Sequence, residues 1–169
     1  MTHENERPNT VGDLLARIRA GWRDFRALVA GREPAALTAM PAGGGWSAKD
    51  LLAHVSAWEC QMLGRLRGLP PHVALGIDEA LLAAGDFGAI NAQIYERNRT
   101  KPLADVLTDL DSVHEELVAE IERLSDEDLR RPVDPAGRYT LLDSIIVRTY
   151  AHYAEHGASI REVLGAGAA

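Results

Sequence analysis

Four long stretches of this chain carry apolar side chains at steps of three and four residues. They cover roughly residues 10–30, 47–67, 102–124 and 140–164. Such spacing places apolar groups on one face of an α-helix, and no segment shows the alternation of a half-buried strand. Each of these helices must bury its apolar face against another element. The pattern predicts an all-α protein built as a four-helix bundle.

Residues that favour helix ends support these boundaries. Ser47 with Asp50, and Thr140 with Asp143, have the spacing of capping boxes at the starts of the second and fourth helices. Pro102 suits the first turn of the third helix, because its missing amide hydrogen is not needed there. The four predicted helices therefore have defined beginnings.

The chain is expected to form one domain with a long internal connection. Residues 1–9 are predicted to be disordered or extended, residues 10–164 to form the bundle, and residues 165–169 to be a flexible tail. The connection between helices 2 and 3 covers residues 70–101 and should hold one or two short helices, including residues 91–98. A connection of this length is either a lid or pocket wall, or a plain structural crossover.

Charge and cysteine content limit which partners the protein could bind and in which cellular compartment it is expected. The formal net charge is −7 and the sequence pI is near 5.3, which argues against a nucleic-acid partner and against an anionic membrane surface. Cys60 is the single cysteine, so no intrachain disulfide can form. The sequence has no signal-peptide core and no apolar run of transmembrane length. We expect a cytoplasmic protein.

Three histidines form the most suggestive chemical pattern. His152 and His156 are four residues apart in the fourth helix, so their side chains lie one turn apart on the same face. His54 lies in the second helix. Two imidazoles from one helix and a third from a facing helix can bind a divalent ion and leave a coordination position open, as catalytic metal sites do.

The helical phase of these histidines predicts that they point inward. At about 100° per residue, His54 lies on the apolar side of its helix with Trp58, while His152 and His156 continue a stripe that contains Ile145. A bundle interior that changes from leucine to histidine indicates a pocket. The alternative is that these are half-buried or surface histidines without a ligand role.

A wider set of motifs resembles a known family. The resemblance is carried by Gly45-Trp46-Ser47-Ala48-Lys49-Asp50-Leu51-Leu52-Ala53-His54, by Ala57-Trp58-Glu59, by Asn91 with Tyr95 to Arg99, by Ser112-Val113-His114, and by Thr149-Tyr150-x-His152-Tyr153-x-Glu155-His156. It is similar to the DinB/YfiT-like superfamily of four-helix metalloproteins, and within it to the ClbS/DfsB branch. In that branch serine directly precedes histidine, so the intervening Val113 is a departure. The similarity covers nearly the whole chain.

The resemblance implies a role for each histidine and a range of reactions. It assigns the metal-ligand role to His54, His152 and His156. The superfamily includes thiol S-transferases and a thiol-dependent isomerase, and one member of the ClbS/DfsB branch protects its producer by hydrolytic opening of an electrophilic toxin. It also implies a homodimer, a small-molecule substrate and, for the transferases, a low-molecular-weight thiol as co-substrate. Zn, Ni, Mn and Fe are all acceptable ions, because the affinity order of divalent metals makes ligand type a poor guide to identity.

Two further residues are candidates for catalysis. Arg148 lies one turn before His152 and could bind a substrate carboxylate, or it could be a solvated surface residue. Glu155 is the better placed of the neighbouring glutamates to act as a general base or to support a metal ligand. A solvated helical glutamate is the alternative.

Five residues are candidates for a substrate pocket. Trp58 and Gln61 are aligned with His54, although Trp58 could equally be core packing. Asn91 and Tyr95 could form a lid wall. His114 shares a stripe with leucines, so it either faces the pocket or is a hydrogen-bonded core histidine.

Two functions of different classes follow. The first is a metal-dependent enzyme that hydrolyses an electrophilic compound or conjugates it to a thiol, for detoxification or self-protection. The second is a non-catalytic protein that binds or sequesters a small molecule in the bundle. A purely structural role for the histidines in a dimerising bundle is the remaining interpretation.

Overall fold

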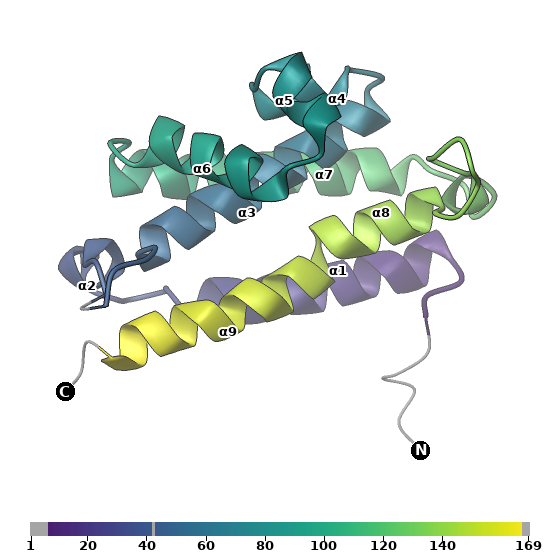
Figure 1. Cartoon of the computed structure of the whole chain (residues 1–169). Helices are drawn as coiled ribbons and strands as arrows, with labels where there is room; N and C mark the ends of the chain where they lie inside the picture. Colours follow the sequence, from purple (N-terminus) through teal and green to yellow (C-terminus); the bar gives the residue numbers. More distant parts are fainter. Residues whose placement is uncertain (1–6, 42, 167–169) are drawn as a thin grey trace.

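The computed structural model describes residues 7–41 and 43–166, and these form helices and connecting turns. Four long helical segments run side by side (Figure 1): α1 (Val11–Ala27), α3 (Ala48–Leu66), α7 (Leu103–Glu122), and α8 (Leu141–Arg148) followed by α9 (Tyr150–Ala166). Shorter elements are α2 (Pro34–Thr38), α4 (Pro71–Leu75), α5 (Glu79–Ala84), α6 (Phe87–Asn98) and a 3-10 turn at Asp128–Arg130. The predicted all-α bundle is confirmed. Most of the two termini predicted to be disordered lies outside the described residues.

The predicted capping boxes hold the starts of α3 and α8. The Ser47 hydroxyl accepts from the Asp50 amide at 3.2 Å, and the Asp50 carboxylate accepts from the Ser47 amide at 3.0 Å. Thr140 and Asp143 make the same reciprocal pair at the start of α8. Both boxes satisfy amide groups that a helix start otherwise leaves unpaired.

Helix α3 is the central element of the bundle. It packs against α7, α9, α4, α6 and α8, so residues on every side of it are buried. Leu52, Val55 and Met62 have no exposed surface and face the main core. A second, smaller cluster of buried apolar residues, which includes Trp58 and Ile94, lies between α3 and α6. Because most of α3 is buried, its buried polar residues face protein or a cavity rather than bulk water.

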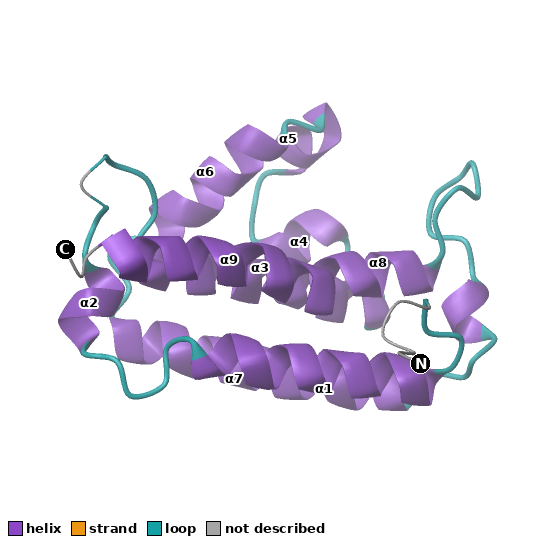
Figure 2. Cartoon of the chain, turned by 90° about the horizontal axis from the view of Figure 1, so that it is seen from below, coloured by secondary structure: helices purple, strands orange, loops and turns teal. Residues whose placement is uncertain are grey.

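The long connection between α3 and α7 is folded into α4, α5 and α6 rather than one or two helices. Figure 2 shows α5 and α6 on the side of α3 away from α1 and α7. Helix α6 packs on α3 through Ile90 and Ile94, which are almost fully buried. Within the described residues no helix is long and apolar enough to cross a membrane.

The predicted last helix, over residues 140–164, is interrupted in the structure at Thr149. This residue has φ −123° and ψ −117°, between α8 and α9. Its hydroxyl donates to the carbonyl oxygen of Ile145 at 2.7 Å, four residues earlier. A threonine hydroxyl bound in this way competes with the helical ladder and bends it. The break sets the direction in which α9 presents its histidines.

Candidate three-histidine metal centre

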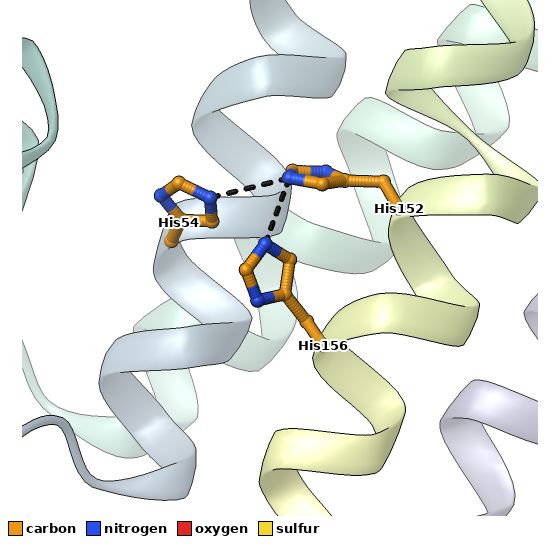
Figure 3. A group of neighbouring side chains, drawn as sticks. All are labelled: His54, His152 and His156. Atoms are coloured by element: carbon orange, nitrogen blue, oxygen red, sulfur yellow. Dashed lines mark hydrogen bonds between the residues drawn. The ribbon is translucent and has the colours of Figure 1, made fainter. Parts of the chain in front are cut away.

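The structure brings His54, His152 and His156 together between α3 and α9. Figure 3 shows the three imidazoles facing one another. The Nε2 atom of His152 lies 3.2 Å from Nε2 of His54 and 2.9 Å from Nε2 of His156. One potential ligand atom from each residue lies within 4.8 Å of the other two. Helices α3 and α9, almost a hundred residues apart in sequence, thus converge on one point.

The surroundings keep these imidazoles uncharged. His54 and His152 are only 4% and 9% exposed, and His156 is half-buried. Loss of hydration, with repulsion from His156 and Arg148, lowers the pKa of His54 to about 3. Burial first, and then His156, His54 and Arg148, lower the pKa of His152 to about 2. Burial also lowers the pKa of His156. Neutral imidazole is the form that binds metal.

The pattern of satisfied and unsatisfied nitrogens fits a divalent ion. A neutral imidazole has one donor and one acceptor nitrogen, so three converging Nε2 atoms cannot all be satisfied by one another. The buried Nδ1 atoms of all three rings lack a hydrogen-bond partner among the described residues. If each ring keeps its proton on Nδ1, all three Nε2 lone pairs point to the shared centre. A three-histidine donor set of this kind suits a catalytic ion with an open position.

The rings are held by packing rather than by hydrogen bonds that they donate to acceptor groups. Trp46 lies against His54 with ring centroids 5.2 Å apart, and Trp58 meets it edge-on at 6.4 Å. Metal-binding histidines usually donate their second N–H to a carboxylate or carbonyl, which strengthens metal binding. The described residues supply no such acceptor here. We therefore expect an exchangeable metal ion.

A cavity of about 270 Å³ opens beside the three histidines. Its wall opposite α9 comes from the long connection, because Phe87 and Asn91 of α6 line it. Asn91 accepts a hydrogen bond from the Trp58 indole at 3.2 Å, which joins α6 to α3. Behind them, Tyr95 stacks on Trp46 at 5.9 Å. Of the two interpretations of residues 70–101, the pocket wall is the one that this geometry supports.

The two catalytic candidates both line this cavity. The Arg148 guanidinium carbon lies 4.2 Å above the Trp58 ring, and the buried Nε of Arg148 has no hydrogen-bond partner among the described residues. Glu155 is exposed at the cavity edge on α9, between the two histidines of that helix. Their chemical roles stay predictions.

Three of the five predicted pocket residues do not line this cavity, and Tyr95, which stacks on Trp46, is one of them. Gln61 is buried but lines a neighbouring cavity, not the one beside the histidines. His114 lies in the core, where its Nδ1 is 3.1 Å from a Glu59 oxygen. Trp22 stacks on the His114 ring, with centroids 3.7 Å apart and planes 5° apart. The structure thus places His114 as a hydrogen-bonded core histidine.

Sequence reasoning missed a polar network in the middle of the bundle. Glu59 has no exposed surface, and it accepts a hydrogen bond from the Tyr153 hydroxyl as well as facing His114. Burial raises the pKa of Glu59, against the opposing effect of its bonds to His114 and Tyr153. The signal was present: Glu59 falls in the apolar stripe of Val55 and Met62. A charged residue in such a stripe indicates a buried partner.

The cavity also uses residues that no motif had singled out as site residues. Trp46, Phe87 and Val147 line it alongside the predicted Trp58, Asn91 and Arg148. Trp46 precedes its helix, and Phe87 belongs to the long connection. Helical periodicity gives no information about side chains in such segments, so only the structure could place them.

The fold and the site define an all-α bundle with a histidine cluster between its second and last long segments. The sequence profile of the DinB superfamily matches residues 17–160. The chain belongs to the DinB superfamily, as the motifs around His54 and His156 predicted.

Solved structures share this fold at low sequence identity. An uncharacterised protein from Escherichia coli UTI89 is 20% identical, with a TM-score of 0.72 over 92% of both chains. The colibactin self-resistance protein ClbS, in complex with a dsDNA, is 17% identical, with a TM-score of 0.74 over 92% of this chain and 96% of ClbS. A Streptococcus pneumoniae protein is 16% identical, with a TM-score of 0.75 over 96% of this chain and 91% of the other. No protein of curated function matches the chain significantly.

The exclusion of nucleic acid as a partner is contradicted by one of these structures. ClbS, which shares this fold, was crystallised with a dsDNA. The exclusion rested on the net charge of −7. Net charge sums over the whole surface, whereas contact with a duplex depends on the cationic and polar groups of one local patch. An acidic total is therefore no argument against a nucleic-acid ligand for a bundle of this kind.

Proposed function

We propose that this protein is a metal-dependent enzyme that acts on an electrophilic small molecule, either by hydrolysis or by conjugation to a low-molecular-weight thiol. One observation carries the proposal. Three neutral imidazoles, His54, His152 and His156, converge within 4.8 Å at the wall of a cavity of about 270 Å³. The role of ClbS in self-resistance to colibactin supports a biological purpose in detoxification or self-protection.

Different residues of the chain would have different roles in such a reaction. A bound Zn, Ni, Mn or Fe ion would supply Lewis-acid activation of a water molecule or of a thiol at its open position. Glu155 lies at the solvent edge of the cavity, where it can accept the proton that such a nucleophile gives up. Arg148 offers an unpaired cationic group on the cavity wall for an anionic part of the substrate. Trp46 and Phe87 supply apolar lining for the substrate.

The first experiment measures the metal directly. Untagged protein is incubated with Zn²⁺, Ni²⁺, Mn²⁺ and Fe²⁺ in turn, desalted, and examined by elemental analysis. We expect about one ion per chain in the wild type and none in His152→Ala, because two imidazoles hold an ion far less tightly than three. His72→Ala is the matched control, since His72 lies on α4 away from the cluster. Equal metal content in wild type and His152→Ala would contradict the site.

The second experiment separates the enzyme from a sequestering protein. The loaded protein is mixed with the electrophile 1-chloro-2,4-dinitrobenzene, with and without glutathione, and product is followed by absorbance. Many turnovers with thiol indicate conjugation, and many turnovers without it indicate hydrolysis. A single equivalent of bound compound without turnover would favour the sequestering alternative. His152→Ala should lose turnover, while His72→Ala keeps it.

A further inference from the structure

A second cavity continues the one beside the histidines. It has a volume of about 370 Å³, and Phe87, Val147 and Arg148 line both cavities. From these shared residues it extends along α3 and α8 toward Gln61 and Arg65. The two cavities together form one groove, with the histidine cluster at one end. A substrate longer than the histidine cavity would extend into this second part.

Two cationic groups in the groove have no carboxylate partner. Arg65 and Arg148 both line the second cavity, and neither forms an ion pair with a described residue. They are close enough that the charge of Arg65, added to burial, lowers the pKa of Arg148. Two like charges that face one cavity without a counter-ion repel each other, and an anion bound between them relieves that repulsion.

The carboxylate in the same wall is already engaged. Asp143 accepts from the backbone and hydroxyl of Thr140 in the capping box of α8, and it lies 2.6 Å from the Arg7 guanidinium. These interactions lower the pKa of Asp143, against burial that would raise it. It is therefore committed to the helix start and does not neutralise Arg65 or Arg148.

The unpaired amide of a largely buried glutamine is a second, independent sign of a ligand. Gln61 is only 6% exposed, lines this cavity, and makes no hydrogen bond to a described residue. Neither amide atom of Gln61 is among the fully buried unpaired atoms of the described residues, so both reach the open space that the cavity provides. An amide supplies both a donor and an acceptor. A polar group of a ligand in the cavity would satisfy it.

The remaining walls are apolar and unusually exposed. Phe87, Tyr139 and Val147 are 58%, 57% and 52% exposed, and all three line this cavity. They make up half of the six large hydrophobic side chains that are most exposed in the described residues. Apolar side chains gathered around a concave surface indicate a ligand site more often than scattered ones do.

We propose that this part of the groove binds the distal end of the substrate, and that the substrate is an amphipathic organic anion. Its flat apolar body packs on Phe87, Tyr139 and Val147. Its carboxylate, sulfonate or phosphate group binds between Arg65 and Arg148. The electrophilic end then reaches the three histidines, a step that rests on the proposed function above.

Two matched probes test the groove without knowledge of the natural substrate. 1-Anilinonaphthalene-8-sulfonate and N-phenyl-1-naphthylamine share the same aromatic body, and only the first carries an anion. We expect fluorescence titration of the full chain to give at least about tenfold tighter binding of the sulfonate, as a charge-assisted hydrogen bond provides. Arg65→Gln should weaken sulfonate binding about tenfold and leave the neutral probe within about twofold. Phe87→Ala should weaken both probes alike.

The control variant is Arg32→Gln, which removes the same charge beside α2, at the opposite end of the bundle from α8 (Figure 1). It should change neither affinity, and circular dichroism should show that all variants keep their helix content. Equal affinity of the two probes for wild type, or equal losses in Arg65→Gln and Arg32→Gln, would overturn the proposal.

The same samples, measured with and without bound metal, separate the two proposals. Selective sulfonate binding in protein that never takes up a metal supports the groove and overturns the proposed function alone. If protein that holds its ion binds the sulfonate and the neutral probe equally well, the proposed anion site in the groove is overturned and the proposed function is not.

Discussion

At the scale of single residues, the least expected side chain is Glu59, a carboxyl group without exposed surface in the middle of the bundle. One oxygen accepts from Tyr153 and faces His114, while the other has no partner among the described residues. The first oxygen fixes Tyr153, the neighbour of His152, against α3. The second leaves part of the charge unsatisfied, so burial raises the pKa of Glu59.

This raised pKa gives a prediction about pH. A carboxyl whose pKa is higher in the folded protein holds its proton more tightly there than in the unfolded chain. Its contribution to stability is complete below the unfolded pKa and is lost as the pH rises through the folded pKa. Glu59→Gln cannot ionise, so its free energy of unfolding relative to wild type should increase from about pH 5 to about pH 8. Urea unfolding of both proteins at both pH values measures this.

The control for Glu59→Gln is Glu155→Gln, which removes an exposed carboxyl group. The change in relative stability between the two pH values should be larger for Glu59→Gln than for Glu155→Gln, because only Glu59 is buried. A Glu59→Gln difference that stays constant, or that shrinks as the pH rises, would show that Glu59 is ionised in the folded protein at both values.

At the scale of elements, the break between α8 and α9 decides how the last segment serves the site. Thr149 is fully buried, and its hydroxyl donates a hydrogen bond to the carbonyl oxygen of Ile145. Thr149→Val fills nearly the same volume without the hydroxyl, so it should lower the free energy of unfolding by about 1 kcal/mol. Because α9 carries two of the histidines, we also expect zinc affinity to fall about tenfold. Urea unfolding and zinc titration measure the two effects.

Thr149→Ser is the matched variant, because it keeps the hydroxyl and loses a buried methyl group. It should lose stability by a similar amount, about 0.8 kcal/mol, yet retain its zinc affinity. Equal zinc affinities in the serine and valine variants would show that the hydroxyl does not set the course of α9.

The sequence could predict the elements better than their connections. Apolar periodicity and the capping boxes at Ser47 and Thr140 placed the long helices correctly, because both signals are local. The break at Thr149 was not predicted, because a side-chain hydrogen bond to the carbonyl four residues earlier leaves the periodicity of the sequence unchanged. The long connection became three helices because tertiary packing of Ile90 and Ile94 on α3 stabilises short helices that are marginal in isolation.

The same limit explains which site residues were found. His54, His152 and His156 could be predicted from the sequence, because helical phase alone makes them face the interior. Gln61 shares the angular position of His54, but seven residues along a helix amount to about 10 Å, which places it in the next cavity. Phase gives direction around a helix, not distance along the groove. Phe87 carries no phase signal, because it belongs to the connection.

At the scale of the whole molecule, a bound ion would join two parts of the chain that are 98 residues apart, at His54 and His152. An ion that binds the folded state alone stabilises it by about 2.7 kcal/mol at a hundred times its dissociation constant. For a chain of this length each kcal/mol raises the melting temperature by roughly 2–4 °C. We therefore expect zinc at that excess to raise the melting temperature by about 5–10 °C, and a chelator to reverse the change.

The size of this stabilisation distinguishes a site between helices from a surface histidine pair. His152 and His156 alone lie on one helix, so an ion bound to them alone would not tie α9 to α3. His54→Ala leaves that pair intact but should abolish most of the zinc-dependent shift in differential scanning calorimetry. A shift that survives His54→Ala would place the ion on α9 alone. A shift that disappears shows that metal binding and the packing of α3 on α9 are one equilibrium, because an ion at this site can bind only when the two helices are in contact.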